Sequence, residues 1–132
     1  MGQTAAVITG VDFMPLPTHD LARAVAFYRD DLGLRMSVHL PERQYAEFET
    51  GNLTLSLMNA EAMGLEHRVQ GHEVALHVED IGAAREQLEA RGVEFRGETL
   101  DTGVCHMAFF NDPDGNALML HHRYTPRAPA PE

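Results

Sequence analysis

Apolar residues recur at helical spacing in two segments of the chain, each directly after an aspartate. A short carboxylate such as Asp20 or Asp80 accepts hydrogen bonds from the free amides of a first helical turn, so both are predicted N-caps. The two helices are predicted to end at Gly33 and Gly92, where a C-terminal cap needs positive φ. The buried stripes are predicted to be Leu21, Ala24, Val25, Tyr28 and Leu32 in the first helix, and Ile81, Ala84, Leu88 and the following Val93 in the second.

Shorter apolar runs follow each helix and predict three strands in each half of the chain. Gly51-Asn52 is expected to turn the first half's last hairpin, and residues 112–116, Asp-Pro-Asp-Gly-Asn, the second's. The predicted strands are Leu34 to His39, Tyr45 to Glu49, Leu53 to Met58, Val93 to Thr99, Cys105 to Phe110 and Ala117 to His121.

The two halves are internal repeats. A shift of 60 residues lays the segment from Phe13 to Leu21 onto the segment from Glu73 to Ile81, which adds a first strand to each half. The expected organisation of residues 1–132 is one α+β domain of two βαβββ modules, at about 10–58 and 72–122. Residues 59–71 form the linker, with a short helical turn, and the proline-rich tail 123–132 is expected to be mobile.

Composition narrows the classes of partner. The 132 residues carry 10 Lys and Arg against 20 Asp and Glu, a formal charge of −10 that repels nucleic acid and anionic lipid. No apolar run is long enough to span a bilayer, and the opening Met1-Gly2-Gln3-Thr4 lacks the basic region of a secretory signal. We therefore expect a cytoplasmic protein with neither nucleic acid nor a membrane as its partner.

The single cysteine, Cys105, excludes an intrachain disulfide and agrees with a reducing compartment. A nucleophilic role is conceivable, but the cysteine lies in a strand-like run, where an inert half-buried thiol is the commoner outcome. His106 would point to the opposite face of that strand and would not activate it.

Three stretches together carry a family resemblance. The segment from Asp20 to Leu34 contains Asp-Leu, Phe-Tyr and Leu-Gly-Leu in order; residues 111–116 read Asn-Asp-Pro-Asp-Gly-Asn; and Val78 to Phe95 forms the second module's helix. In these features the chain resembles the glyoxalase/bleomycin-resistance/dioxygenase (vicinal oxygen chelate) superfamily. The resemblance implies curled mixed sheets around a cup, in a homodimer, with the site on the concave face.

In metal-using members of that superfamily, His, Gln or Glu ligands come from the first and last strands of each module. The corresponding positions here are Phe13, Leu55, Glu73 and Met119, and only Glu73 is a suitable ligand for a divalent ion of that kind. We therefore expect no cofactor. A displaced metal site from Glu47, Glu73 and His121 is the alternative, although no spacing shows that these side chains converge.

The expected binding site is a mostly apolar cup with a few polar anchors. Strand alternation places Met119 and His121 on one face, and Tyr45 and Glu47 on a face opposite the helix-packed Ala46 and Phe48. The predicted ligand-binding residues are Phe13, Tyr45, Glu47, Leu55, Glu73, Met119 and His121.

Three functions agree with this cup. The first is metal-free binding and sequestration of a small molecule, as in the drug-binding members. The second is an enzyme, a lyase, isomerase or dioxygenase, with an atypical metal set or with Glu73 as general base after apolar neighbours raise its pKa. The third is a module that retains only dimerisation.

Overall fold

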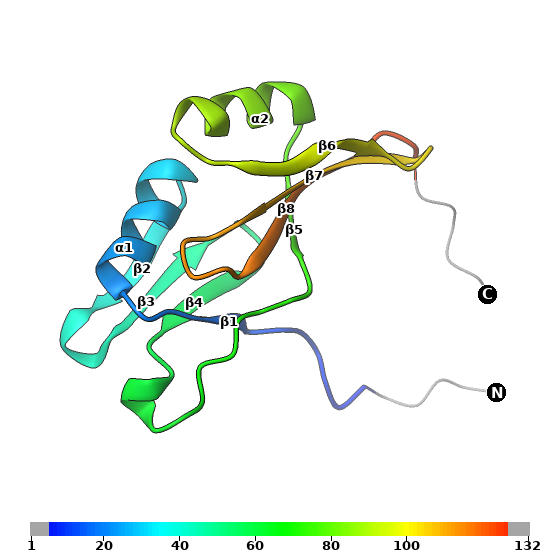
Figure 1. Ribbon diagram of the computed structural model, residues 1–132. Coiled ribbons are helices and arrows are strands. Elements are labelled where there is room, and N and C mark those ends of the chain that lie inside the picture. The colour runs from blue at the N-terminus through cyan, green and yellow to red at the C-terminus, as the bar shows by residue number, and fades with distance from the viewer. Residues whose placement is uncertain (1–5, 127–132) are drawn as a thin grey trace.

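The computed structural model describes residues 6–126, which form two four-stranded mixed sheets, each covered by its own helix (Figure 1). Sheet A has the strand order β1-β4-β3-β2 and sheet B the order β5-β8-β7-β6. In both sheets the first strand pairs in parallel with the last strand of the same module, and the other pairs are antiparallel. The strands are β1 (Phe13–Pro17), β2 (Arg35–Leu40), β3 (Tyr45–Glu49), β4 (Thr54–Met58), β5 (Val74–His77), β6 (Phe95–Asp101), β7 (Cys105–Asn111) and β8 (Ala117–Arg123).

These strands confirm the two predicted βαβββ modules, with differences of one or two residues at most ends. Pro15 and Pro17 fit β1 because it is an edge strand, where a missing N–H removes no hydrogen bond from a second neighbour. The linker contains the expected short helical turn, a 3-10 helix at Glu61–Met63, and a second one at Pro41–Arg43 joins β2 to β3.

Both helices begin at the predicted caps. α1 (Leu21–Ala26) starts where the Asp20 carboxylate accepts the Arg23 amide at 3.1 Å, and α2 (Ile81–Ala90) where Asp80 accepts the Ala83 amide at 3.0 Å. The first helical segment continues as a π-helical turn at Phe27–Asp31, which the sequence pattern did not predict. Gly33 and Gly92 follow the helices with φ of +74° and +94°, as expected for C-terminal caps.

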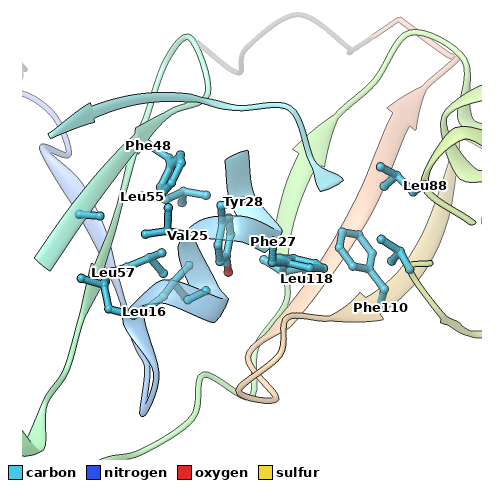
Figure 2. Close-up of a cluster of buried hydrophobic side chains, with 14 of the residues drawn as sticks. Leu16, Val25, Phe27, Tyr28, Phe48, Leu55, Leu57, Leu88, Phe110 and Leu118 are labelled. Carbon is cyan, nitrogen blue, oxygen red and sulfur yellow. The ribbon is translucent and has the colours of Figure 1, made fainter. Parts of the chain in front are cut away.

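One hydrophobic core joins the two modules around α1. Figure 2 shows Val25 and Tyr28 of α1 and its π-helical turn beside Phe48 and Leu55 of sheet A, whereas Phe27 lies toward sheet B. The Phe27 ring is 6.4 Å from the Phe110 ring between centroids. The core also holds Leu16, Leu21, Ala24, Ala46, Leu57, Leu88, Val93, Ala108, Leu118 and Leu120.

Each sheet therefore has one face in this shared core and one face turned away from it, which we call the open face. On sheet A the core-facing register pairs Phe48 with Leu55, whereas the next row, Glu47 with Ser56, belongs to the open face. On sheet B the corresponding core row contains Phe110 and Leu118, and the open row contains Phe109 and Met119.

The chain ends differ in part from expectation. β8 continues to Arg123, and the Tyr124 hydroxyl donates to Asp101 at 2.8 Å, so the start of the proline-rich tail is tied to the body. Met1 to Thr4 and the rest of the tail from 127 onward lie outside the described residues. Within residues 6–126, no helix has both the length and the apolar character needed to cross a bilayer.

Candidate functional site

Six of the seven predicted site residues lie on the open faces. Phe13, Tyr45 and Glu47 belong to the open face of sheet A, and Phe13 is 48% exposed. On sheet B, Met119 pairs with Ala75 and His121 pairs with His77, so both side chains share the open face with Glu73, which directly precedes β5. The two groups are held on separate sheets, with the shared core between them.

The seventh residue, Leu55, requires a correction. It is fully buried against Tyr28 and Phe48 and does not reach the open face of sheet A. In the β3–β4 turn the Thr50 amide donates to the Leu53 carbonyl. In the β7–β8 turn the Asp112 amide donates to the Asn116 carbonyl, so this turn is one residue longer. Matching the two Gly-Asn pairs therefore slipped the register by one residue, which moves a side chain to the opposite face.

Ser56 is the residue that corresponds to Met119. It pairs with Pro15 in β1, as Met119 pairs with Ala75 in β5, and Pro15 and Ala75 are related by the 60-residue repeat. The four positions from which metal-using relatives supply ligands are thus Phe13, Ser56, Glu73 and Met119.

The polar groups on the open face of sheet A are already paired with one another. The Tyr45 hydroxyl donates to Glu47, and the pKa of Tyr45 is raised, first by partial burial and then by that carboxylate. Glu49 accepts from the hydroxyls of Ser37 and Thr54, the latter at 2.6 Å. These two hydrogen bonds lower the pKa of Glu49, so it is a carboxylate at neutral pH.

An ion pair spans the open face of sheet B. Arg96 of β6 places Nη2 3.3 Å from Oε1 of Glu73, beside β5, so the pair joins the two outer strands across β7 and β8. The guanidinium lies 5.8 Å from the centroid of the Phe109 ring, which belongs to the same face. The Arg96 and Glu73 side chains are 49% and 27% exposed.

The Glu73 carboxylate is a weaker base than the proposed general-base role requires. Its pKa is lowered, first by a hydrogen bond from its own backbone amide and then by Arg96. The expectation that apolar neighbours would raise this pKa is therefore not met. A carboxylate with a lowered pKa is a weaker proton acceptor near pH 7.

The donors at the four ligand positions do not fit an octahedral metal centre. They are a phenyl ring, a hydroxyl, one carboxylate that is committed to Arg96, and a thioether. Glu47 lies on sheet A, whereas Glu73 and His121 lie on sheet B, so one chain does not bring these three side chains together. Across residues 6–126 no three His, Cys, Asp or Glu side chains are grouped so as to hold a metal ion.

A separate groove lies between the modules on the core side. It has a volume of about 420 Å³ and is lined mainly by aliphatic side chains, with Arg91 and Gln87 among the polar ones. Leu55 contributes to this groove, and Phe13, Met119 and Glu73 do not. It is thus distinct from the open faces.

Sequence reasoning missed Ser56, Glu49 and Arg96. Strand alternation in Tyr45–Glu49 already places Glu49 on the same face as Glu47, so that signal was available. The Arg96–Glu73 contact joins residues 23 apart in sequence, and only the curvature and order of the strands bring them together.

The two-module fold agrees with the family that the sequence matches. The chain belongs to the glyoxalase/bleomycin resistance protein/dioxygenase superfamily, whose family model matches residues 9–120. This result confirms both the predicted family and the fold of two modules.

Individual relatives differ in what they do. The uncharacterized protein YraH of Bacillus subtilis (strain 168) is 29% identical over 118 residues, covering 80% of this chain and 92% of YraH. TnmS3, an antibiotic binding protein from Streptomyces sp. CB03234, has a similar structure with a TM-score of 0.75 at 24% identity, covering 90% of this chain and 99% of TnmS3. Lactoylglutathione lyase from Agrobacterium tumefaciens matches with a TM-score of 0.74 at 21% identity, over 88% and 95% of the two chains. At these identities the two structures show a shared fold.

Proposed function

We propose that this protein binds an apolar small molecule without a metal ion. The observation that carries the proposal is the donor set at the four ligand positions, where Phe13, Ser56 and Met119 leave Glu73 as the one carboxylate. Phe13 and Met119 offer apolar contact surface, and Ser56 is buried, where a metal centre would need charged or imidazole ligands.

The apolar groups on the open faces support this proposal. Met107, Phe109 and Met119 form neighbouring rows on sheet B, and Phe13 lies half exposed on sheet A. Methionine and aromatic side chains give polarisable, adaptable contact area, which suits a ligand with a flat or irregular apolar body. The likeness in fold to an antibiotic binding protein is in line with such a role.

We infer that the binding cup contains two copies of the chain. Within one copy the two open faces both lie away from the shared core, so they do not enclose a ligand together. In a two-fold symmetric dimer, the open face of sheet A from one copy can face the open face of sheet B from the other, which gives two equivalent cups. The cup is therefore proposed as Phe13, Tyr45 and Glu47 of one copy, with the buried Ser56 beneath them, and Glu73, Met119 and His121 of its partner. Because such a cup also brings together Glu47, Glu73 and His121, the alternative metal set, metal analysis is part of the test.

The test measures binding of the neutral apolar dye Nile red, together with metal analysis of protein purified without chelator. We expect saturable binding that raises the melting temperature and persists after exhaustive dialysis against EDTA. Met119→Asp places an unpaired charge in the cup and should weaken binding at least about tenfold. Met63→Asp, at an exposed methionine of the linker, is the matched control and should leave binding unchanged.

Two outcomes would contradict the proposal. One is a stoichiometric divalent ion that EDTA removes together with binding, which would favour the enzyme with an atypical metal set. The other is dye binding that Met119→Asp does not affect, which would place the ligand elsewhere, as in the groove between the modules.

A further inference from the structure

The Arg96–Glu73 ion pair is the charged feature nearest to Phe109 and Met119 among the contacts described for the open face of sheet B. Because the pair runs from β6 to the start of β5, a molecule that lies over Phe109 and Met119 must lie beside it or between its two members. The following inference rests on the proposed function, because it concerns the ligand of that same cup.

The geometry of the pair makes it easy to open. The contact joins one guanidinium nitrogen to one carboxylate oxygen at 3.3 Å, so it is not the bidentate arrangement that Arg and carboxylates form when they bind most strongly. Both side chains keep access to water, and pairs of this kind contribute little to stability. A ligand that separates the two side chains therefore disturbs the fold little.

The ligand charge that the cup favours depends on which protein charge the bound ligand leaves unpaired. A simple anion that binds Arg96 would leave the Glu73 carboxylate unpaired when the cup closes over the ligand, and a simple cation that binds Glu73 would leave Arg96 unpaired. Either residual charge is costly once water is excluded. A molecule with both charges can pair with Glu73 and Arg96 at the same time and leaves no charge uncompensated.

We propose that the cup selects zwitterionic ligands with an apolar body, of the amino acid or short peptide class. The ammonium group pairs with Glu73, the carboxylate pairs with Arg96, and the apolar body packs on Phe109 and Met119. The lowered pKa of Glu73 supports this reading, because that carboxylate is ionised at neutral pH.

The test uses four probes that share an indole and differ in charge. L-tryptophan is zwitterionic, N-acetyl-L-tryptophan anionic, L-tryptophanamide cationic and N-acetyl-L-tryptophanamide neutral. The protein contains no tryptophan, so the fluorescence anisotropy of the probe reports binding without background. We expect L-tryptophan to bind about tenfold more tightly than either singly charged probe, the effect of one charge-assisted hydrogen bond, and more tightly than the neutral probe, which makes neither of the two.

Variants of the pair should change the preferred charge in opposite directions. Arg96→Gln leaves Glu73 and should make L-tryptophanamide the preferred probe, whereas Glu73→Gln leaves Arg96 and should make N-acetyl-L-tryptophan the preferred one. The double variant Arg96→Gln/Glu73→Gln should bind the neutral probe best. Arg68→Gln, which removes an exposed Arg68–Glu66 pair in the linker, is the control and should keep the wild-type order.

The outcomes separate this inference from the proposed function. Equal binding of all four probes, or an order that neither variant alters, overturns the zwitterion preference, and so does Nile red binding without binding of any indole probe. If neither Nile red nor any indole probe binds, the proposed function fails as well. A shift of preference by each single variant in its own direction supports the inference, because loss of folding would weaken all four probes alike.

Discussion

Tyr28 forms a buried hydrogen bond between the first module and the second, and Asn116 also links them by donating to the carbonyl of Pro17. The Tyr28 hydroxyl donates to Oδ2 of Asp112 at 2.7 Å, and both side chains are buried. Asp112 also accepts hydrogen bonds from the backbone amides of Asp114 and Asn116, each at 2.9 Å. One carboxylate therefore holds the β7–β8 turn and binds the π-helical turn that follows α1. The Asp-Pro-Asp-Gly-Asn motif thus has a structural role in this chain.

Tyr28→Phe should lower the free energy of unfolding by about 1 to 3 kcal/mol, because it removes a buried hydrogen bond to a charged acceptor. Urea unfolding at pH 7 measures this change. Tyr124→Phe is the matched control, since it removes a similar bond from an exposed hydroxyl to Asp101, and should cost no more than about 0.5 kcal/mol. Equal decreases in the free energy of unfolding for the two variants would show that the buried hydrogen bond stabilises the fold no more than the exposed one.

The same variant tests a dependence on pH. The pKa of Tyr28 lies well above its ordinary value of 10.0, first because the ring is buried and then because Asp112 is negative. Above about pH 10 the unfolded chain loses this proton while the folded chain keeps it, so stability falls by up to about 1.4 kcal/mol per pH unit. Tyr28→Phe lacks this contribution, and its disadvantage at pH 7 should shrink between pH 9 and 11.

At the scale of elements, α2 depends on the cap that begins it. Asp80 accepts the Ala83 amide at 3.0 Å, and within the helix Leu88 is the buried side chain. Asp80→Ala should therefore lower the free energy of unfolding by about 0.5 to 2 kcal/mol, measured by urea unfolding. Glu86→Ala, an exposed position of the same helix, should change stability by about 0.5 kcal/mol at most. A similar effect of both substitutions would contradict a capping role for Asp80.

Sequence periodicity predicted these elements well because their signals are local. The capping aspartates and the glycines with positive φ act within one turn, and the structure confirms them. The π-helical turn was not predictable in the same way. It places Phe27 and Tyr28, which are adjacent in sequence, both in the core, one near Phe110 and the other near Phe48.

The candidate site was harder to predict because it depends on register and on strand order. A difference of one residue between two turns moved Leu55 into the core and put Ser56 on the open face. The identity of both residues was known from the start, but their faces follow from backbone hydrogen bonds that no composition or motif encodes. Arg96 was also not predictable, because the order and curvature of the strands of sheet B bring it to Glu73.

At the scale of the whole molecule, the two modules of one chain behave as a single packed unit. Their cores merge around α1, and Arg91 after α2 donates to the carbonyl of Asp31 after α1 at 2.7 Å. Because this packing holds the open faces away from the shared core, the chain would need to lose much of that core before its own two faces could meet. A cup of two copies needs no such rearrangement.

Mixing two defective proteins tests whether the cup contains two chains. Phe13→Asp places a charge on the open face of sheet A, and Met119→Asp places one on the open face of sheet B, so neither variant alone should bind Nile red. After mixing under conditions of subunit exchange, half of the dimers are mixed, and each mixed dimer contains one cup with both faces intact. Binding should therefore recover to about one quarter of the wild-type sites. If each cup came from a single chain, every cup in the mixture would carry one of the two substitutions and no binding would return.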